Sequence, residues 1–214
     1  MKVLIVNTSE RTGGAAVAAK RLLEALNGNG VKAKMLVGTK ESDHISVAQM
    51  PHQKRLHWNF LWERLCIWVR LRFQRRHLFE VDMANAGCDI TKLPEFREAD
   101  IIHLHWINQG TLSLNGIRRI LESGKPVVWT MHDMWPCTGI CHHARDCEQF
   151  QQQCEGCFYL QSIHPDLSTK VFRAKSQLYC TAPMTFVGCS QWLTNRVHQS
   201  RLVIGKQVLS IPNP

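Results

Sequence analysis

Two hydrophobic periodicities alternate along this chain, and they predict the order of its strands and helices. Residues 2–7 form a short apolar run with β-branched side chains, which is typical of a buried parallel strand. After a polar turn, apolar residues between 15 and 26 recur at helical spacing, and Asn27-Gly28 ends that helix. Residues 31–37 predict a second strand, so the chain begins with a strand–helix–strand unit.

The same alternation continues to the end of the chain. Ser113 is placed to cap a helix that ends near Gly124, and further helices are expected at 167–179 and 190–200. Strands are predicted at residues 100–106, 126–131, 184–189 and 207–211. Strands that alternate with helices in this way predict the α/β class, as a Rossmann-like, doubly wound parallel sheet with helices on both faces.

Composition limits the environment in which the chain works. With 214 residues, of which 44% are hydrophobic, it can bury a core without disulfides or metal. It lacks an apolar run of the length that spans a bilayer, and the apolar run at its start is too short for a signal peptide. We therefore expect a cytoplasmic protein with reduced thiols.

The chain ends on the sequence IPNP, residues 211–214. A strand that runs into Pro-Asn-Pro is typical of the start of a linker. We therefore expect residues 1–214 to be one domain of a longer protein, with a cysteine-rich insertion at 134–160.

The positive charge is concentrated in one segment. Residues 52–77 hold seven lysines and arginines and one glutamate, which accounts for +6 of the formal net charge of +9. Three tryptophans, Trp58, Trp62 and Trp68, are interleaved with these cations. The pattern favours a helix that packs on the sheet with a solvated basic face. Two other interpretations stay open, namely peripheral membrane contact through 54–77, at the inner face of the membrane, and a nucleic-acid patch.

A glycine pair follows the first predicted strand. Gly13 and Gly14 open a helix, so bare backbone N–H groups face whatever is bound at the strand end. This arrangement suits a phosphate or a sugar hydroxyl, although an ordinary tight turn explains the pair equally well. The spacing is not the GxGxxG pattern of dinucleotide-binding enzymes.

Histidines mark the ends of two later strands. His105 and Asn108 follow the strand at 100–106, and His132-Asp133 follows the strand at 126–131. The carboxyl ends of parallel strands border the ligand crevice, so His105, Asn108, His132 and Asp133 are candidate site residues. His132 and Asp133 are the expected catalytic pair, since a histidine there can bind a hydroxyl or transfer a proton and the aspartate can orient a histidine or accept from a hydroxyl. The structural alternative for Asp133 is a turn cap.

The four cysteines of the insertion have the spacing C-x5-C-x6-C-x2-C, and they are Cys141, Cys147, Cys154 and Cys157. Two residues between thiolates allow both to reach one tetrahedral ion, so the pattern indicates a closed, structural zinc site. Cys137, His142 and His143 compete as ligands. The alternative is a set of reduced cysteines in a polar loop.

Taken together, these motifs resemble the amino-terminal half of a family 4 glycosyltransferase of the GT-B type, from a branch found in bacterial polysaccharide biosynthesis. The resemblance spans nearly the whole chain and is weakest at 50–92. It is carried by KVLIVN with TGGAA, DIIHLHWIN, PVVWTMHDMWPCTG, the cysteine block, and FVGCSQW followed by IPNP. Members of this branch usually have an aromatic residue at the position of Cys137, which is therefore not expected to be a ligand.

The resemblance implies retaining transfer of a sugar from a nucleotide-diphosphate donor to a saccharide or lipid-linked acceptor. It implies that Gly13 and Gly14 approach the donor phosphate or the acceptor, that His132 contacts the donor sugar, and that Ser190 lines the cleft. It also implies a covalently linked carboxy-terminal domain that binds most of the nucleotide sugar, without which this chain is inactive.

Two functions from other classes remain alternatives. One is a zinc-stabilised nucleic-acid-binding module, and the other is a sugar-binding domain without catalysis. Residues 137–157 hold Arg145 against Asp146, Glu148 and Glu155. A nucleic-acid module should be basic at this point, because phosphate neutralisation supplies most of its affinity. We therefore expect no nucleic-acid partner.

Overall fold

A seven-stranded parallel sheet forms the centre of the protein in the computed structural model, which describes residues 1–161 and 166–213. Its strands are β1 (Lys2–Ser9), β2 (Lys32–Thr39), β3 (Val47–Gln49), β4 (Ile101–Leu104), β5 (Val127–Met131), β6 (Met184–Gly188) and β7 (Gln207–Ser210). Their order across the sheet is β3-β2-β1-β4-β5-β6-β7. The predicted Rossmann-like α/β class is therefore confirmed.

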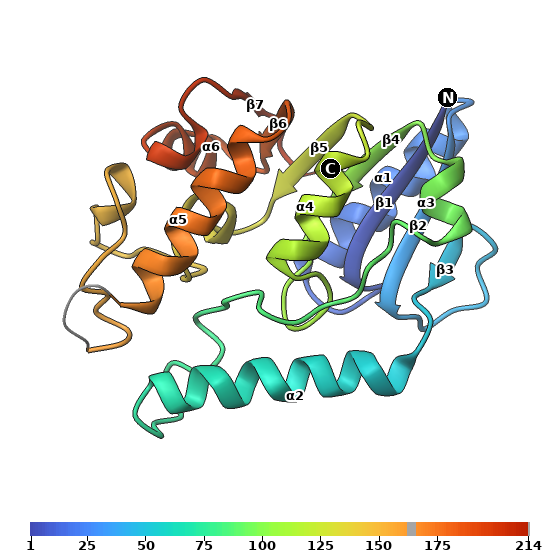
Figure 1. Ribbon diagram of the computed structural model, residues 1–214. Coiled ribbons are helices and arrows are strands. Elements are labelled where there is room, and N and C mark those ends of the chain that lie inside the picture. The colour runs from blue at the N-terminus through green and yellow to red at the C-terminus, as the bar shows by residue number, and fades with distance from the viewer. Residues whose placement is uncertain (162–165, 214) are drawn as a thin grey trace.

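Helices connect the strands and cover both faces of the sheet (Figure 1). They are α1 (Gly14–Gly28), α2 (Gln53–Arg70), α3 (Pro94–Glu98), α4 (Leu114–Glu122), α5 (Leu167–Cys180) and α6 (Gln191–His198). Three short 3-10 turns accompany them among the described residues, at Trp135–Cys137, Gln149–Gln151 and Arg201–Val203. None of the helices in this part of the chain combines the length and apolarity that crossing a bilayer requires.

Strand β1 shows why both faces are covered. Its side chains alternate, so Val3 and Ile5 join the core formed with α1, whereas Leu4 and Val6 join the larger core on the opposite face. The larger core also takes in the inward residues of α4, α5 and α6. A strand that is buried on both faces has to be apolar throughout, as residues 3–6 are.

Two short elements were not predicted from the sequence. The edge strand β3 has three residues, and α3 has five. Neither is long enough for a periodicity to stand out, and β3 is recognisable only by its pairing with Met35, Leu36 and Val37 of β2.

Helix α2 lies beyond the carboxyl ends of β1 and β2 (Figure 1). The backbone at Gly110, after β4, approaches it so closely that a Cβ atom there would lie 2.5 Å from the nitrogen of Phe60. The inward face buries Glu63, Arg64 and Ile67. The expected packing of this segment is therefore observed, but its outward face carries tryptophan and leucine as well as basic side chains.

Candidate active site at the switch point of the sheet

A pocket of about 630 Å³ lies where the winding of the sheet reverses, beside the ends of β1 and β4. From β1 the chain proceeds to β2 and β3 on one side, and from β4 to β5, β6 and β7 on the other. The connections diverge at this point and leave a crevice, which is where open α/β sheets bind ligands. The pocket is lined by Asn7, Thr8, Ser9, Thr12, Gly13, Gly14, Ala15, Thr39, Trp106, Gln109, His132, Asp133, Cys189 and Asn213.

The glycine pair forms one wall of this pocket. Gly13 has a φ of 89°, which residues other than glycine rarely adopt. It is the N-cap residue of α1, and no side chain caps the helix there. A Cβ atom added at Gly13 or Gly14 would meet nothing within 4 Å. The first turn of α1 therefore presents backbone N–H groups and the positive end of the helix dipole to open space, an arrangement suited to an anion.

A histidine pair stands at the ends of β4 and β5. Nδ1 of His105 lies 2.9 Å from Nε2 of His132, and the two rings are stacked. His132 lines the pocket, whereas His105 is buried behind it. A third histidine, His103, is held at 2.8 Å from Oγ1 of Thr130. The tertiary structure thus makes His105 a partner of His132, not a lining residue.

Burial keeps these histidines neutral near pH 7. It lowers the pKa of His103 to about 4 and that of His105 well below its usual range, and the neighbouring rings add to both effects. Burial also lowers the pKa of His132, although the charge of Asp133 opposes this shift. A neutral ring next to the pocket can both donate and accept a hydrogen bond, so it suits a hydroxyl ligand.

Asp133 is fully engaged by protein groups. Its Oδ1 accepts from the backbone N–H of Trp135 at 2.8 Å, and its Oδ2 accepts from Nε1 of Trp106 at 2.7 Å and from Nδ1 of His142 at 2.8 Å. Burial alone would raise the pKa of Asp133, but the charge of His142 and these hydrogen bonds outweigh it and lower the pKa. The carboxylate is therefore held ionised and fixed in orientation.

The contacts of Asp133 continue into the protein. The second ring nitrogen of His142 lies 2.7 Å from Oδ2 of Asp82, and the other oxygen of Asp82 pairs with the guanidinium of Arg64 on α2. Both ring nitrogens of His142 thus face carboxylate oxygens, which only accept hydrogen bonds. The pocket edge is thereby joined to α2 through a continuous series of polar side chains. This connection was not predicted, because Asp82 and Arg64 belong to no motif and His142 was considered only as a metal ligand.

Other predicted residues lie in different surroundings. Ser190 is the N-cap of α6, where its Oγ accepts from the backbone N–H of Leu193 at 3.2 Å. Asn108 is buried, and its Nδ2 has no hydrogen-bond partner among the described residues. Neither residue lines the pocket, whereas their neighbours Cys189 and Gln109 do.

The expected zinc site is not formed by the described residues. No group of three or more histidine, cysteine, aspartate or glutamate side chains in 1–161 and 166–213 is placed to hold a metal ion. Cys141 and Cys154 are buried, and Sγ of Cys154 accepts from the backbone N–H of Gly139 at 3.1 Å. Cys147 and Cys157 pack partly buried against the core. All four cysteines are free thiols in this structure.

A buried lysine anchors the loop after β5. Lys175 of α5 is fully buried, and its Nζ donates to the carbonyl oxygens of Trp135, Thr138 and Gly139 at 2.6, 3.1 and 3.0 Å. The ammonium also lies 3.4 Å from the ring centroid of Trp135. In addition, the hydroxyl of Tyr179 donates to the carbonyl of Pro136 at 2.8 Å. These contacts fix the loop that begins with His132-Asp133.

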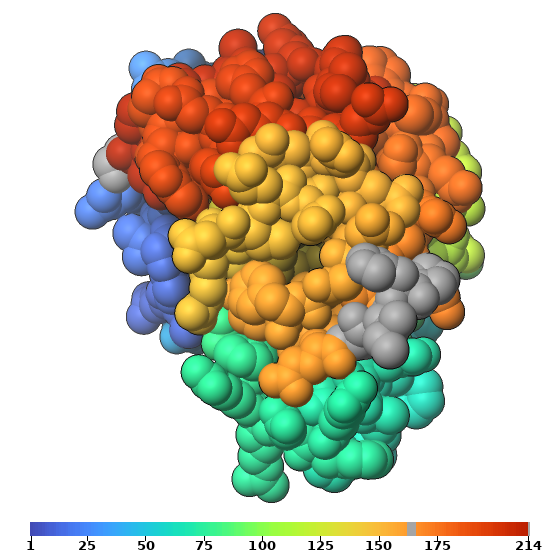
Figure 2. Space-filling model, turned by 90° about the vertical axis from the view of Figure 1, so that its left-hand side faces the viewer, coloured from blue at the N-terminus to red at the C-terminus, as the bar shows by residue number. Residues whose placement is uncertain are grey.

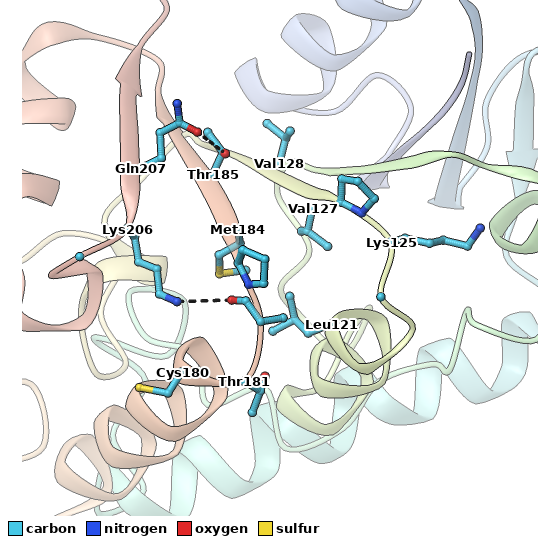
Figure 3. A pocket seen from close by; sticks show the side chains of 15 residues that line it. Leu121, Lys125, Val127, Val128, Cys180, Thr181, Met184, Thr185, Lys206 and Gln207 are labelled. Atoms are coloured by element: carbon cyan, nitrogen blue, oxygen red, sulfur yellow. Dashed lines mark hydrogen bonds between the residues drawn. The ribbon is translucent and has the colours of Figure 1, made fainter.

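A second hollow of about 600 Å³ lies at the opposite, amino-terminal edge of β5, β6 and β7 (Figure 3). Its two lysines are engaged by carbonyl groups, Lys125 with Ala99 and Lys206 with Ala182. With both cations already bonded, this hollow lacks the convergent polar groups of a ligand site. The switch-point pocket is the better candidate.

Comparisons with known proteins identify the family of this chain. Residues 12–214 match the family described as Glycosyltransferase Family 4. A curated relative, WcaC of Escherichia coli (strain K12), is named as a colanic acid biosynthesis glycosyl transferase, and it is 30% identical over 98 residues. The matched region covers 42% of this chain and 24% of the relative, so the chain spans about a quarter of the relative's length.

Proposed function

This chain belongs to glycosyltransferase family 4, and from that premise we propose that it is the acceptor-side half of a GT-B enzyme. The enzyme transfers a sugar, with retention of configuration, from a nucleotide-diphosphate donor to a saccharide or lipid-linked acceptor. A second α/β domain, covalently linked to this one, holds most of the nucleotide, so this chain alone is inactive. The name of the relative supports a saccharide product.

One observation carries the proposal. The pocket at the switch point combines an anion-binding feature, the bare start of α1 at Gly13-Gly14, with a neutral hydrogen-bonding ring, His132. A sugar diphosphate carries anionic phosphates and neutral hydroxyls, and it needs both kinds of partner within a short distance. The volume of the switch-point pocket, about 630 Å³, lies within the range of small-ligand sites.

In this proposal His132 is the catalytic residue in contact with the donor sugar. Its Nε2 is occupied by His105, and the described residues supply no partner for its Nδ1. The free nitrogen is therefore available to a sugar hydroxyl. Because the ring is neutral near pH 7, it binds the hydroxyl without adding positive charge that would oppose an oxocarbenium-like transition state.

Asp133 acts as a positioning residue in this scheme. Both of its oxygens already accept hydrogen bonds from Trp135, Trp106 and His142, so it is not free to take a proton from an acceptor. Its fixed charge and backbone hold the turn that presents His132 to the pocket. This role is narrower than the catalytic one expected from the sequence.

The start of α1 stabilises the leaving group. During transfer, the bond between the anomeric carbon and the diphosphate oxygen breaks, the acceptor oxygen bonds to that carbon, and the acceptor proton leaves with the diphosphate. Negative charge develops on the diphosphate, and preorganised N–H groups stabilise it without reorganisation. Gly14 has no side chain that would keep the phosphate at a distance.

The proposal can be tested with this chain by histidine-resolved NMR. The probes are UDP-glucose and GDP-mannose as donors and methyl glycosides as acceptor fragments. We expect one of these probes to shift the His132 ring resonances and the amide signals of Gly13 and Gly14. Shifts confined to residues outside the switch-point pocket would contradict the proposal. Shifts from the glycosides alone, with no transfer activity in a polypeptide that includes the second domain, would indicate a non-catalytic sugar-binding domain.

A further inference from the structure

Helix α2 exposes a continuous apolar row on its outward face. Trp58, Leu61, Trp62, Leu65 and Val69 are all exposed, and Trp58 and Trp62 leave 69% and 56% of their surface open. They are spaced three and four residues apart, so they share one face of the helix. The row is about 16 Å long at 1.5 Å per residue. Single exposed apolar residues are common, but a row of this length on a soluble fold indicates a binding surface.

The charges around this row have one sign. Lys54 and Arg55 lie at its amino end, and Arg70, Arg72, Arg75 and Arg76 lie at its carboxyl end, all of them exposed. The one acidic residue between positions 44 and 79, Glu63, is fully buried on the inward face. The exposed charged side chains between positions 44 and 79 are therefore all lysines and arginines, and none is acidic.

The inward face of α2 explains why the apolar row cannot turn into the core. Glu63 accepts from the backbone N–H of Ala84 at 2.6 Å, and Arg64 pairs with Asp82. Ile67 is buried, and the backbone at Gly110 lies against Phe60. These contacts fix the rotation of the helix, so the tryptophans point away from the sheet. Figure 1 shows α2 on the outer side of the molecule, with its far side uncovered.

Helix α2 also borders the candidate site. A smaller hollow of about 270 Å³ is lined by Leu56, His57 and Phe60 of α2, together with Thr8, Thr39 and Gln109. Those last three residues also line the switch-point pocket. The hollow therefore extends the pocket towards α2. In Figure 2 the segment containing α2 forms one end of the visible surface.

We propose that the outward face of α2 lies flat on an anionic lipid surface. The tryptophan and leucine side chains enter the boundary between head groups and acyl chains, and the lysines and arginines contact lipid phosphates. This arrangement leaves α2 between the bilayer and the hollow that extends the pocket. The inference concerns binding and goes beyond the proposed function, because lipid contact does not require that sugar transfer occurs.

The charges argue against a second copy of the chain as the occupant of this face. In a two-fold dimer through α2, the same patch faces itself, so the six cations of one copy would approach those of the other. An acidic lipid surface instead supplies the opposite charge along the whole row. Self-association is therefore an outcome that the experiment has to exclude.

The experiment measures sedimentation of this chain with phosphatidylcholine vesicles that contain or lack phosphatidylglycerol. We expect binding to the anionic vesicles that weakens as salt rises. Replacing three cations, in the variant R72Q/R75Q/R76Q, should lower the partition coefficient about a hundredfold, since each cation near the surface contributes about fivefold. The variant W58S/W62S should abolish most of the remaining binding.

Matched controls separate the surface of α2 from general effects. Trp192 on α6 is exposed to a similar degree, 53%, so Trp192→Ser should leave vesicle binding unchanged. The control R118Q/R173Q/R201Q removes three exposed arginines elsewhere and should lower binding much less than the α2 variant. Absence of binding at low salt, or equal loss in both arginine variants, would overturn the proposal. A dimer in light scattering that W58S/W62S dissociates, without vesicle binding, would assign the row to self-association instead.

Discussion

Nδ1 of His105 lies 2.9 Å from Nε2 of His132, and this contact joins a buried ring to a ring that lines the pocket. It uses one nitrogen of His132 and leaves the other for a ligand. It also fixes the orientation of the His132 ring, since a ring held at one nitrogen and stacked on its neighbour has little rotational freedom. The proposed role of His132 depends on this arrangement.

Replacing His132 by alanine should reduce sugar transfer about a hundredfold in a polypeptide that contains both domains, because a contact to the donor sugar at the reacting centre is lost. Initial rates of nucleoside diphosphate release measure the effect. The exposed His198 supplies the control, and His198→Ala should leave the rate unchanged. Equal rates for His132→Ala and the unmodified enzyme would remove His132 from the site.

The buried histidines should make the fold sensitive to acid. The pKa values of His103, His105 and His132 are lowered in the folded state. Below pH 6.5 the unfolded chain therefore binds more protons at these histidines than the folded chain does. The contribution of these histidines to stability should therefore be fully present above pH 6.5 and should be lost as the pH drops towards about 4, the pKa of His103. His103 alone accounts for up to about 3 kcal/mol of this loss. Urea unfolding across this range tests the slope, which His103→Asn should reduce and His44→Asn, at an exposed site, should not.

Gly14 offers a test that separates binding from stability. Gly14→Ala adds a methyl group in open space within a helix, so stability should be unchanged or rise by up to about 1 kcal/mol. Gly28, at the other end of α1, is equally open, and Gly28→Ala is the matched control. Only Gly14→Ala should weaken donor use, seen as a higher KM for the nucleotide sugar, because only its methyl group enters the pocket. The same kinetics for both variants would count against phosphate binding at α1.

Lys175→Met should destabilise the fold by about 3 kcal/mol at neutral pH. The substitution removes the donor to three buried carbonyl oxygens, which then lack a partner. Lys170→Met, on the exposed face of α5, should cost little. Denaturant unfolding monitored by circular dichroism measures both.

The pH dependence of this difference gives a second check. Burial lowers the pKa of Lys175 from 10.5 to about 7, so the unfolded chain binds one more proton between these values. The unmodified protein should therefore gain stability relative to Lys175→Met as the pH rises from about 7 towards 10. A difference that stays constant with pH would mean that Lys175 keeps its charge in the folded state.

The contact between Asp82 and His142 should show strong coupling. In a double-mutant cycle with Asp82→Asn and His142→Gln, we expect a coupling energy of about 1–3 kcal/mol, because both side chains are largely buried and lie in hydrogen-bond contact. The pair of His77 and Glu80 has a similar distance of 2.9 Å but is more exposed, and its coupling should stay below about 1 kcal/mol. Similar values for the two pairs would show that burial does not strengthen the contact of His142.

The elements that sequence reasoning predicted well are those specified by local signals. Ser113 was expected to cap a helix, and its Oγ accepts from the N–H of Gly116 at 3.0 Å. The buried run at residues 3–6 forms the centre of β1, as its composition indicated. Hydrophobic periodicity and capping act within a few residues, so they can be read along the chain without the fold.

Part of the candidate site was also accessible from the sequence. His132, Asp133, Gly13 and Gly14 were singled out because they follow predicted strands, and the structure places all four around one pocket. The pairing of His105 with His132 spans 27 positions, and the contact of His142 with Asp82 spans 60. Contacts of that separation depend on strand order and loop path, which periodicity does not specify.

The cysteine block shows how spacing can mislead. The spacing of Cys141, Cys147, Cys154 and Cys157 indicated four ligands around an ion, because it describes how close residues are along the chain. The fold instead buries the thiols of Cys141 and Cys154 in the core, and Lys175 anchors the loop. Spacing limits which residues can meet, whereas packing decides which of them do.

The sequence by itself determined the strand–helix order, the family resemblance and the positions where chemistry is expected at strand ends. Only the tertiary structure decided which groups face the pocket, that Asp133 already accepts from three donors, and that α2 turns Trp58 and Trp62 outward. The physical reason is the separation along the chain over which each interaction acts. Backbone preferences and side-chain periodicity act between near neighbours, whereas burial, hydrogen bonding and charge pairing act between residues that only the folded chain brings together.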